Sequence, residues 1–219
     1  MKPKAIVFDA YGTLFDVNSA AERCKIKLGN KWESFANYWR TTQLEYTWLR
    51  SLMKKHKDFW QITEDSLDKS MKVFNIDNKL KNELLNLYKI LSPYPEVKKV
   101  LKVLKEKEFK LAILSNGTPD LLRELVKSNN LNNLFDDLFS IEKVKIYKPD
   151  SKVYDIPIKK YKIRPEEIIF LSSNTWDVSG GGNYGYNSVW VNRNKAHFDN
   201  LDYLPKNEIG NLTQLLDIL

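Results

Sequence analysis

Four short apolar runs, spaced along the chain, constrain its fold more than any other feature. Each run is continuous and lacks polar alternation, as burial on both faces of a parallel sheet requires. Helical periods separate the runs, and this alternation predicts an α/β fold with a doubly wound, mostly parallel sheet. The expected strands are 5–9, 110–116, 166–174 and 187–192, and the expected helices are 95–107, 118–129, 150–161 and about 176–184. A weaker run at 137–144 is either a further strand or an extension off the sheet.

One long segment breaks the alternation. From about residue 17 to residue 92 the chain shows only helical periods, and this block follows directly after the first strand. The stretch "SPYPEV" at 92–97 contains two prolines, which end helices, and marks the return. We therefore expect a Rossmann-like core of residues 1–15 and 93–219, with residues 16–92 inserted as a helical cap subdomain.

The charge balance argues against a nucleic-acid partner. The formal charge is +7, from 35 Lys and Arg against 28 Asp and Glu, but the basic residues are mostly lysines scattered among acids. A solvated surface explains this pattern better than a binding stripe does. There is no run of 18 apolar residues, so we expect no membrane span. Cys24 is the only cysteine, so no disulfide within the chain is possible, and we expect a buried thiol in a reducing cytoplasm.

Polar residues gather just after the expected strands. Ligands of open α/β sheets bind outside the carboxyl ends of the strands, so these residues should share one edge of the sheet. They comprise two carboxylates, one ammonium group and several neutral hydrogen-bonding groups. In chain order they are Asp9, Tyr11, Thr13, Ser115, Asn116, Lys148, Ser172, Ser173, Asn174, Trp176 and Asp177.

The stretches that carry these residues resemble a known family. "FDAYGTL", "LAILSNG", "KPD" and "SSNTWD" occur in the order and spacing of the haloacid dehalogenase-like hydrolases. With the inserted "WRTTQLEYTWLRSLM", the chain resembles the L-2-haloacid dehalogenases from residue 4 to about residue 193. The resemblance implies hydrolysis of short L-2-haloalkanoic acids to D-2-hydroxy acids and halide. It also implies an aspartyl ester on Asp9, inversion at the alpha carbon and no cofactor.

A magnesium-dependent phosphatase of the same superfamily is the alternative. Such phosphatases carry a second acid two residues after the nucleophile, which protonates the leaving alcohol, and here that residue is Tyr11. In the last motif only Asp177 is acidic, so one expected metal ligand is missing. A halide leaving group needs no proton, and both departures fit dehalogenation. We assign no metal, since His56 and His197 lie outside the motifs and form no ligand pattern.

The resemblance assigns a role to each core candidate. Asp9 is the nucleophile, Lys148 holds it ionised, and Asp177 helps to activate water. The hydroxyls of Thr13 and Ser115 can donate to the carboxylate of Asp9 or of the substrate. Ser172 and Asn174 position the reacting groups or merely cap the next helix, while Tyr154 matches a family tyrosine. The candidate catalytic residues are Asp9, Thr13, Arg40, Ser115, Lys148, Tyr154, Ser172, Asn174 and Asp177.

Arg40 is the candidate from the cap. Helical spacing places Arg40, Leu44, Thr47 and Ser51 on one face. By resemblance Arg40 receives the departing halide, with Asn116 and Phe59 nearby; the alternative is a helix arginine that faces solvent. The expected substrate-binding residues are Tyr11, Arg40, Leu44, Phe59, Ser115, Asn116 and Trp176.

Two features depart from the family pattern. Gly180–Gly182 stand where a basic residue is common, and we expect them to loosen a turn at 179–182. Thr41 replaces a glutamine that is common beside the cap arginine, which would alter the pocket. The family is often dimeric, so a homodimer is the assembly that the resemblance suggests.

Overall fold

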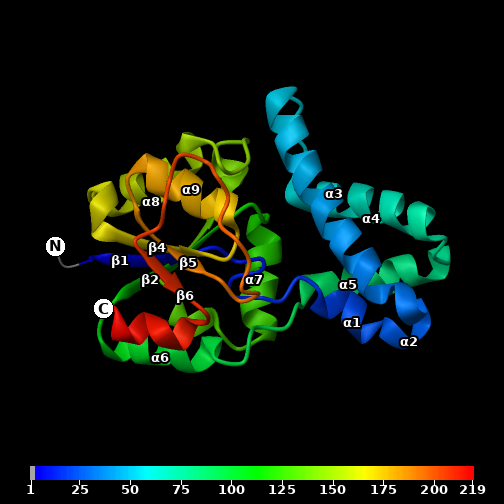
Figure 1. Ribbon diagram of the computed structural model, residues 1–219, viewed down its shortest axis with the longest axis horizontal. Helices are drawn as coiled ribbons and strands as arrows, with labels where there is room; N and C mark the ends of the chain where they lie inside the picture. The colour runs from blue at the N-terminus through cyan, green and yellow to red at the C-terminus, as the bar shows by residue number, and fades with distance from the viewer. Residues whose placement is uncertain (1–2) are drawn as a thin grey trace.

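The computed structural model describes residues 3–219 and is built on a six-stranded sheet (Figure 1). The strand order is β3-β2-β1-β4-β5-β6, and every neighbouring pair is parallel. All four residues of β1 are buried, as expected for a central strand covered on both faces. The expected doubly wound parallel sheet is confirmed. Its strands are β1 (Ala5–Phe8), β2 (Lys110–Ser115), β3 (Asp137–Ser140), β4 (Ile168–Ser172), β5 (Asn187–Val191) and β6 (Asn207–Ile209).

The two edge strands of the sheet are the ones that the sequence did not predict clearly. The first half of the weak run at 137–144 forms the edge strand β3, and the chain then turns into a short 3-10 helix, Ile141–Lys143. Strand β6 on the other edge was not expected. Its three residues include only one buried side chain, Ile209, so no apolar run marks it.

Four helices cover the sheet: α6 (Val97–Glu106), α7 (Pro119–Ser128), α8 (Ser151–Tyr161) and α9 (Thr175–Tyr184). Helices α8 and α9 lie on one side and α6 on the other (Figure 1). Helix α6 buries Val97, Val100, Leu101 and Leu104, the spacing of a single helical face. These helices agree with the expected ranges to within two residues at each end.

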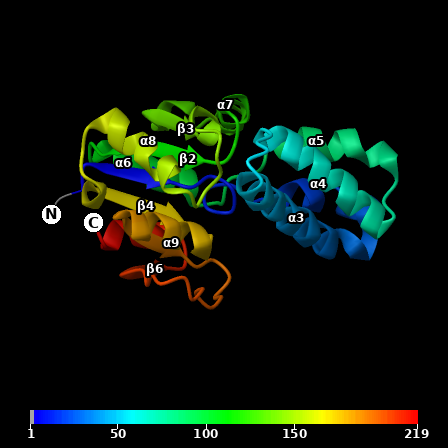
Figure 2. The same cartoon turned by 90° about the horizontal axis from the view of Figure 1, so that it is seen from above.

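The remaining helices form a separate group beside one end of the sheet (Figures 1 and 2). They are α1 (Ser19–Arg23), α2 (Lys25–Leu28), α3 (Trp32–Leu52), α4 (Phe59–Phe74) and α5 (Lys81–Lys89), and they bury Cys24 as expected. Helix α4 begins where the Asp58 side chain accepts from the Gln61 amide at 2.8 Å. None of the helices within residues 3–219 has both the length and the apolar character that a membrane crossing requires.

The chain leaves the core and returns to it through two segments that lie side by side. The Asp16 amide donates to the Ser92 carbonyl at 2.8 Å, and the Tyr94 amide donates to the Leu14 carbonyl at 3.0 Å. These bonds tie the helical group to the loop that follows β1. Side chains of the helical group that face the sheet therefore lie near the end of β1.

The three glycines at 180–182 contradict the expectation of a loosened turn, because they lie inside helix α9. They allow close packing instead. A Cβ atom on Gly181 would lie 2.7 Å from a ring carbon of Phe170, and one on Gly180 would lie 2.5 Å from the Tyr154 hydroxyl. A Cβ on Gly182 would overlap the ring of Tyr203. The helix thus packs against its neighbours at a distance that only glycine permits.

We expect Gly181→Ala to destabilise the protein by about 1–3 kcal/mol, because overpacking against the buried Phe170 ring outweighs the better helix propensity of alanine. Chemical denaturation measures this change. Gly182→Ala is the control: Tyr203 is only half-buried and can swing away, so the loss there is smaller. Equal stability of Gly181→Ala and the parent protein would contradict the close-packing account.

Candidate functional site

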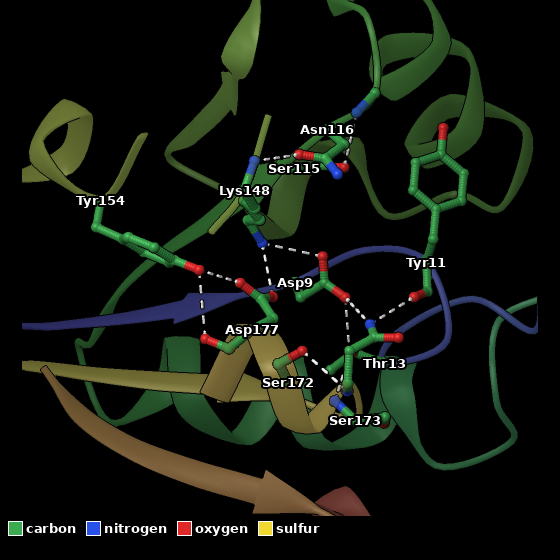
Figure 3. Close-up of polar contacts among 12 residues, drawn as sticks. Asp9, Tyr11, Thr13, Ser115, Asn116, Lys148, Tyr154, Ser172, Ser173 and Asp177 are labelled. Atoms are coloured by element: carbon green, nitrogen blue, oxygen red, sulfur yellow. Dashed lines mark hydrogen bonds and ion pairs between the residues drawn. The ribbon is translucent and has the colours of Figure 1, made fainter. Parts of the chain in front are cut away.

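The centre of the site is the carboxylate of Asp9, which follows β1 and is only 5% exposed. The Asp9 amide donates to the Leu171 carbonyl at 2.8 Å, which continues the pairing between β1 and β4 by one residue. Three side chains donate to the carboxylate (Figure 3). Lys148 Nζ lies 3.1 Å from Oδ1, while Thr13 Oγ1 and Asn174 Nδ2 lie 3.1 and 2.9 Å from Oδ2.

Lys148 lies between two carboxylates and is 1% exposed. Its ammonium group contacts Asp177 Oδ2 at 2.8 Å as well as Asp9 (Figure 3). Burial alone would lower the pKa of Lys148, but the charges and hydrogen bonds of Asp177 and Asp9 raise it above its ordinary value. The lysine therefore carries the positive charge that allows two acids to share this buried space.

Asp177 is fully buried in the first turn of α9. The Tyr154 hydroxyl donates to Asp177 Oδ1 at 2.7 Å, and Lys148 donates to the other oxygen. Burial raises the pKa of Asp177 to about 6, because desolvation and the nearby Asp9 outweigh the stabilisation from Lys148 and Tyr154. Asp177 thus titrates closer to neutrality than an ordinary aspartate does.

The hydrogen bonds of Asn174 show whether its side chain caps helix α9 or positions Asp9. Asn174 is the N-cap residue of α9, yet its side chain makes no capping hydrogen bond. The amide nitrogen donates to Asp9 Oδ2 and, at 3.3 Å, to the Tyr11 carbonyl instead. Ser172 Oγ accepts from the Asn174 backbone amide at 3.1 Å, so Ser172 shapes the loop, and in the described part of the chain no hydrogen bond joins its side chain to Asp9.

The residues after β2 contact the site less directly than expected. Ser115 Oγ accepts from the Gly117 amide at 3.1 Å, and among residues 3–219 it donates no hydrogen bond to Asp9. Asn116 Oδ1 accepts from the backbone amide of Lys148 at 3.1 Å (Figure 3). The two side chains line the same sheet edge, and Asn116 helps to place the segment that carries Lys148.

The cap supplies Arg40 from α3. Arg40 is half-buried and does not simply face solvent: its Nη2 lies 3.4 Å from the Tyr11 carbonyl, and its Nη1 donates to Gln43 Oε1 at 2.9 Å. Ser51, on the same face of α3, accepts from the Tyr147 amide of the core at 3.2 Å. The face predicted from helical spacing is therefore turned toward the core.

An open cleft of about 470 Å³ lies between cap and core at this edge. Arg40, Leu44, Asn174 and Trp176 are among its lining residues. Tyr11 and Phe59 are not among them. Both are buried, and their rings pack against each other with centroids 5.1 Å apart. Thr41, the other departure from the family pattern, is exposed on α3 and is not among the lining residues either.

Three polar residues near the site were missed by the sequence analysis. Arg193 follows β5, where the rule that found the other loop residues applies, and its Nη2 donates to the Thr13 carbonyl at 2.8 Å. Arg193 also pairs with Glu96 at 2.7 Å. Gln43 and Tyr88, which lie behind Arg40, come from two helices of the cap. No sequence pattern indicates that these two side chains meet.

The histidines lie away from the Asp9 carboxylate. His56 Nε2 contacts the Glu142 carboxylate at 3.1 Å, and His197 is one of the residues that line the cleft. Within residues 3–219, no group of three His, Cys, Asp or Glu side chains is arranged to hold a metal ion.

Comparison with known proteins places this geometry in a family. The model of the haloacid dehalogenase-like hydrolases matches residues 3–185. (S)-2-haloacid dehalogenase 1 from Pseudomonas sp. (strain CBS-3) is 40% identical over 220 residues, which cover 99% of this chain and 96% of that protein. (S)-2-haloacid dehalogenase 4A from Burkholderia cepacia is 37% identical over 219 residues, covering 99% and 94%.

The same likeness extends to three dimensions. The structure of L-2-haloacid dehalogenase from Xanthobacter autotrophicus, with chloropropionic acid covalently bound, superposes with a TM-score of 0.91. It is 31% identical, and the match covers 99% of this chain and 98% of that one. In sequence and in structure the chain belongs to the haloacid dehalogenase-like hydrolases, and among them to the (S)-2-haloacid dehalogenases.

Proposed function

We propose that the protein hydrolyses short L-2-haloalkanoic acids to D-2-hydroxy acids and halide. The observation that carries this proposal is the environment of Asp9. Its carboxylate is buried at the edge of the sheet and accepts hydrogen bonds from three side chains. Arg40 reaches the loop that follows Asp9, where its Nη2 lies 3.4 Å from the Tyr11 carbonyl. The position where a phosphatase needs an acid is occupied by the buried ring of Tyr11.

In the first step the Asp9 carboxylate attacks the alpha carbon from the side opposite the halogen. A carbon–oxygen bond forms while the carbon–halogen bond breaks, and the halide leaves with the bonding electrons. This displacement gives an ester on Asp9 and inverts the alpha carbon. Lys148 favours the attack because its ammonium group, 3.1 Å from Oδ1, compensates the negative charge of the carboxylate in a buried site.

The substrate carboxylate and the halide both need polar partners. The Ser115 hydroxyl accepts from Gly117, which leaves its own hydrogen free to donate to the substrate carboxylate. Arg40 has five N–H donors, and two of its bonds go to Gln43 and Tyr11. The remaining donors and the positive charge can stabilise the halide as its negative charge develops.

In the second step water attacks the ester carbonyl carbon of Asp9, and the bond between that carbon and the substrate oxygen breaks. The substrate oxygen leaves with the bonding electrons and takes up the proton that Asp177 has accepted, which gives the hydroxy acid. The alpha carbon takes no part and keeps its inverted configuration. Asp177 accepts the proton from this water, and its raised pKa brings it closer to the range of an effective general base. Lys148 and Tyr154 hold the Asp177 carboxylate on its two oxygens. Lys148 also lies where charge develops on Asp9 as the ester breaks down.

The phosphatase alternative lacks support at the same position. Burial raises the pKa of Tyr11 well above its ordinary value, so its hydroxyl is a poor substitute for the acid that protonates a leaving alcohol. Ser172 and Ser173 stand where phosphatases usually carry Gly-Asp, so one carboxylate of their metal site is missing. These residues favour a leaving group that needs no proton.

We also propose that the chain is divided into two parts with different roles in the reaction. We assign residues 16–92 to a cap that carries Arg40 and Leu44, and residues 1–15 and 93–219 to a core that carries the reacting acids. A homodimer and a cytoplasmic location stay predictions from the family resemblance and from the single cysteine. Exposed Leu49, Leu52 and Met53 on and just after α3 are the apolar side chains that a second copy would cover.

We expect Asp9→Asn to abolish chloride release from L-2-chloropropionate, with a loss of at least about 10⁴-fold in kcat, because the nucleophile is removed. Free chloride is measured in EDTA, so that no divalent metal contributes. The matched control is Asp120→Asn, an exposed aspartate on α7 paired only with Arg123, which should leave the rate unchanged. No chloride from the parent protein with several short haloacids would overturn the proposed function.

We expect a single turnover in H₂¹⁸O, with enzyme in excess, to place heavy oxygen in Asp9 before it appears in product. The reason is that water attacks the carbonyl carbon of the ester and leaves one of its oxygens in the aspartate. Mass spectrometry of the peptide that contains Asp9 measures the label. Direct labelling of the hydroxy acid in the first turnover would rule out the ester route.

We expect kcat, with ester hydrolysis limiting the rate, to fall about tenfold per pH unit below pH 6, because the general base Asp177 acts in that step, must be ionised and has a pKa raised to about 6. Tyr154→Phe removes a hydrogen bond that favours the carboxylate form, so the fall should begin at a higher pH in this variant. A pH–rate profile of both proteins measures the shift. An acid limb at the same pH in both would show that Asp177 does not control it.

A further inference from the structure

We propose that Gln43 is a positioning residue that orients Arg40 toward the departing halide. The inference rests on the proposed function, in which Arg40 receives the halide, and adds a residue that acts through it. Gln43 lies three residues after Arg40 on α3, so the two side chains share one face of the helix. Gln43 is 1% exposed, which excludes an ordinary solvated glutamine.

The hydrogen bonds around Gln43 fix the orientation of its amide. The Thr63 hydroxyl donates to the Phe59 carbonyl at 2.7 Å, so toward Gln43 it can only accept. Gln43 Nε2 therefore donates to Thr63 Oγ1 at 2.7 Å. The Tyr88 hydroxyl contacts both ends of the amide, accepting from Nε2 at 2.9 Å and donating to Oε1 at 3.2 Å. The amide oxygen must therefore face Arg40, and Nη1 donates to it at 2.9 Å.

A neutral acceptor suits this position. A carboxylate would hold Arg40 more strongly, but the resulting ion pair would reduce the positive field available to a halide. The amide oxygen of Gln43 orients the guanidinium and leaves its net charge intact. The Tyr11 carbonyl, 3.4 Å from Nη2, is likewise a neutral acceptor.

The same group of side chains also packs against the buried aromatic residue beside Asp9. The Tyr88 ring is stacked on the Tyr11 ring, with centroids 5.8 Å apart and an angle of 19° between the planes. Tyr88 thus links the amide that holds Arg40 to the aromatic residue beside Asp9. Loss of Gln43 should loosen Arg40 while the cap, packed through α3 and α4, stays folded.

The leaving group reveals whether Gln43 acts through Arg40. Chloride is a poorer leaving group than bromide, so its departure depends more on stabilisation of the developing charge. A defect in the orientation of Arg40 should therefore slow a chloro substrate more than a bromo substrate. A general loss of stability would slow both to the same extent.

The test compares Gln43→Met with the parent protein. We expect kcat/KM to fall about tenfold for L-2-chloropropionate, the effect of losing one hydrogen bond to a charged group, and less for L-2-bromopropionate. Inhibition by sodium chloride should weaken in parallel. Ser70→Ala is the matched control: it removes a buried cap hydroxyl that, within residues 3–219, bonds only the Ser66 carbonyl, so the chloro-to-bromo ratio should not change.

A second variant keeps the inference testable if Gln43→Met does not fold. Thr63→Val removes the hydroxyl that accepts from Gln43 Nε2 at 2.7 Å and keeps the shape of the side chain, so it should change the chloro-to-bromo ratio in the same direction. An unchanged ratio and unchanged chloride inhibition in the folded variants would overturn the role of Gln43.

Arg40→Met separates this failure from that of the proposed function. If Arg40→Met weakens chloride inhibition and Gln43→Met does not, only the role of Gln43 is wrong. If Arg40→Met also leaves chloride inhibition unchanged, Arg40 does not receive the halide, and the proposal for Gln43 falls with it. If the parent protein releases no halide from either substrate, the proposed function itself is wrong.

Discussion

The ammonium group of Lys148 is the interaction on which the site depends. It lies 3.1 Å from Asp9 and 2.8 Å from Asp177, with all three side chains buried. Two carboxylates this close in a poorly solvated space would otherwise drive one another to the protonated form. Removal of the lysine would leave an uncompensated buried charge, which is costly to stability as well as to reactivity. The site can therefore hold a nucleophile and a base together only because a cation lies between them.

The parallel sheet brings these three groups together. Asp9 follows β1, Asp177 follows β4, its neighbour in the sheet, and Lys148 lies on the connection from β3 to α8. Thr13 then joins the loops, since its hydroxyl donates to Asp9 and accepts from the Ser173 amide at 2.8 Å. Arg193 follows β5, and its Nη2 donates a hydrogen bond to the Thr13 carbonyl. Each loop at this edge thus restrains the next one.

The cap completes the site from a different direction. Arg40 lies on a helix that is inserted between β1 and α6, and the paired segments at Asp16–Ser92 and Leu14–Tyr94 hold that insertion beside the Asp9 loop. Within the cap, Gln43, Thr63 and Tyr88 form a buried polar group behind the arginine. A buried polar group must satisfy its hydrogen bonds, and doing so gives Arg40 a single orientation. One network of hydrogen bonds therefore supports the reacting acids of the core, and a separate network supports Arg40 of the cap.

The amino-acid sequence alone determined the parallel sheet, the helical insertion and the placement of Asp9 and Tyr11, because apolar runs and the residues that end them are local features. Only the tertiary structure decided which partner each polar side chain takes. Asn174 turns to Asp9 and makes no cap, Ser115 bonds Gly117, and Gly180–Gly182 pack inside a helix. Gln43 meets Arg40, Tyr88 and Thr63 for the same reason: a hydrogen bond needs atoms within about 3 Å, and segments distant in the chain reach that separation only when the fold has formed.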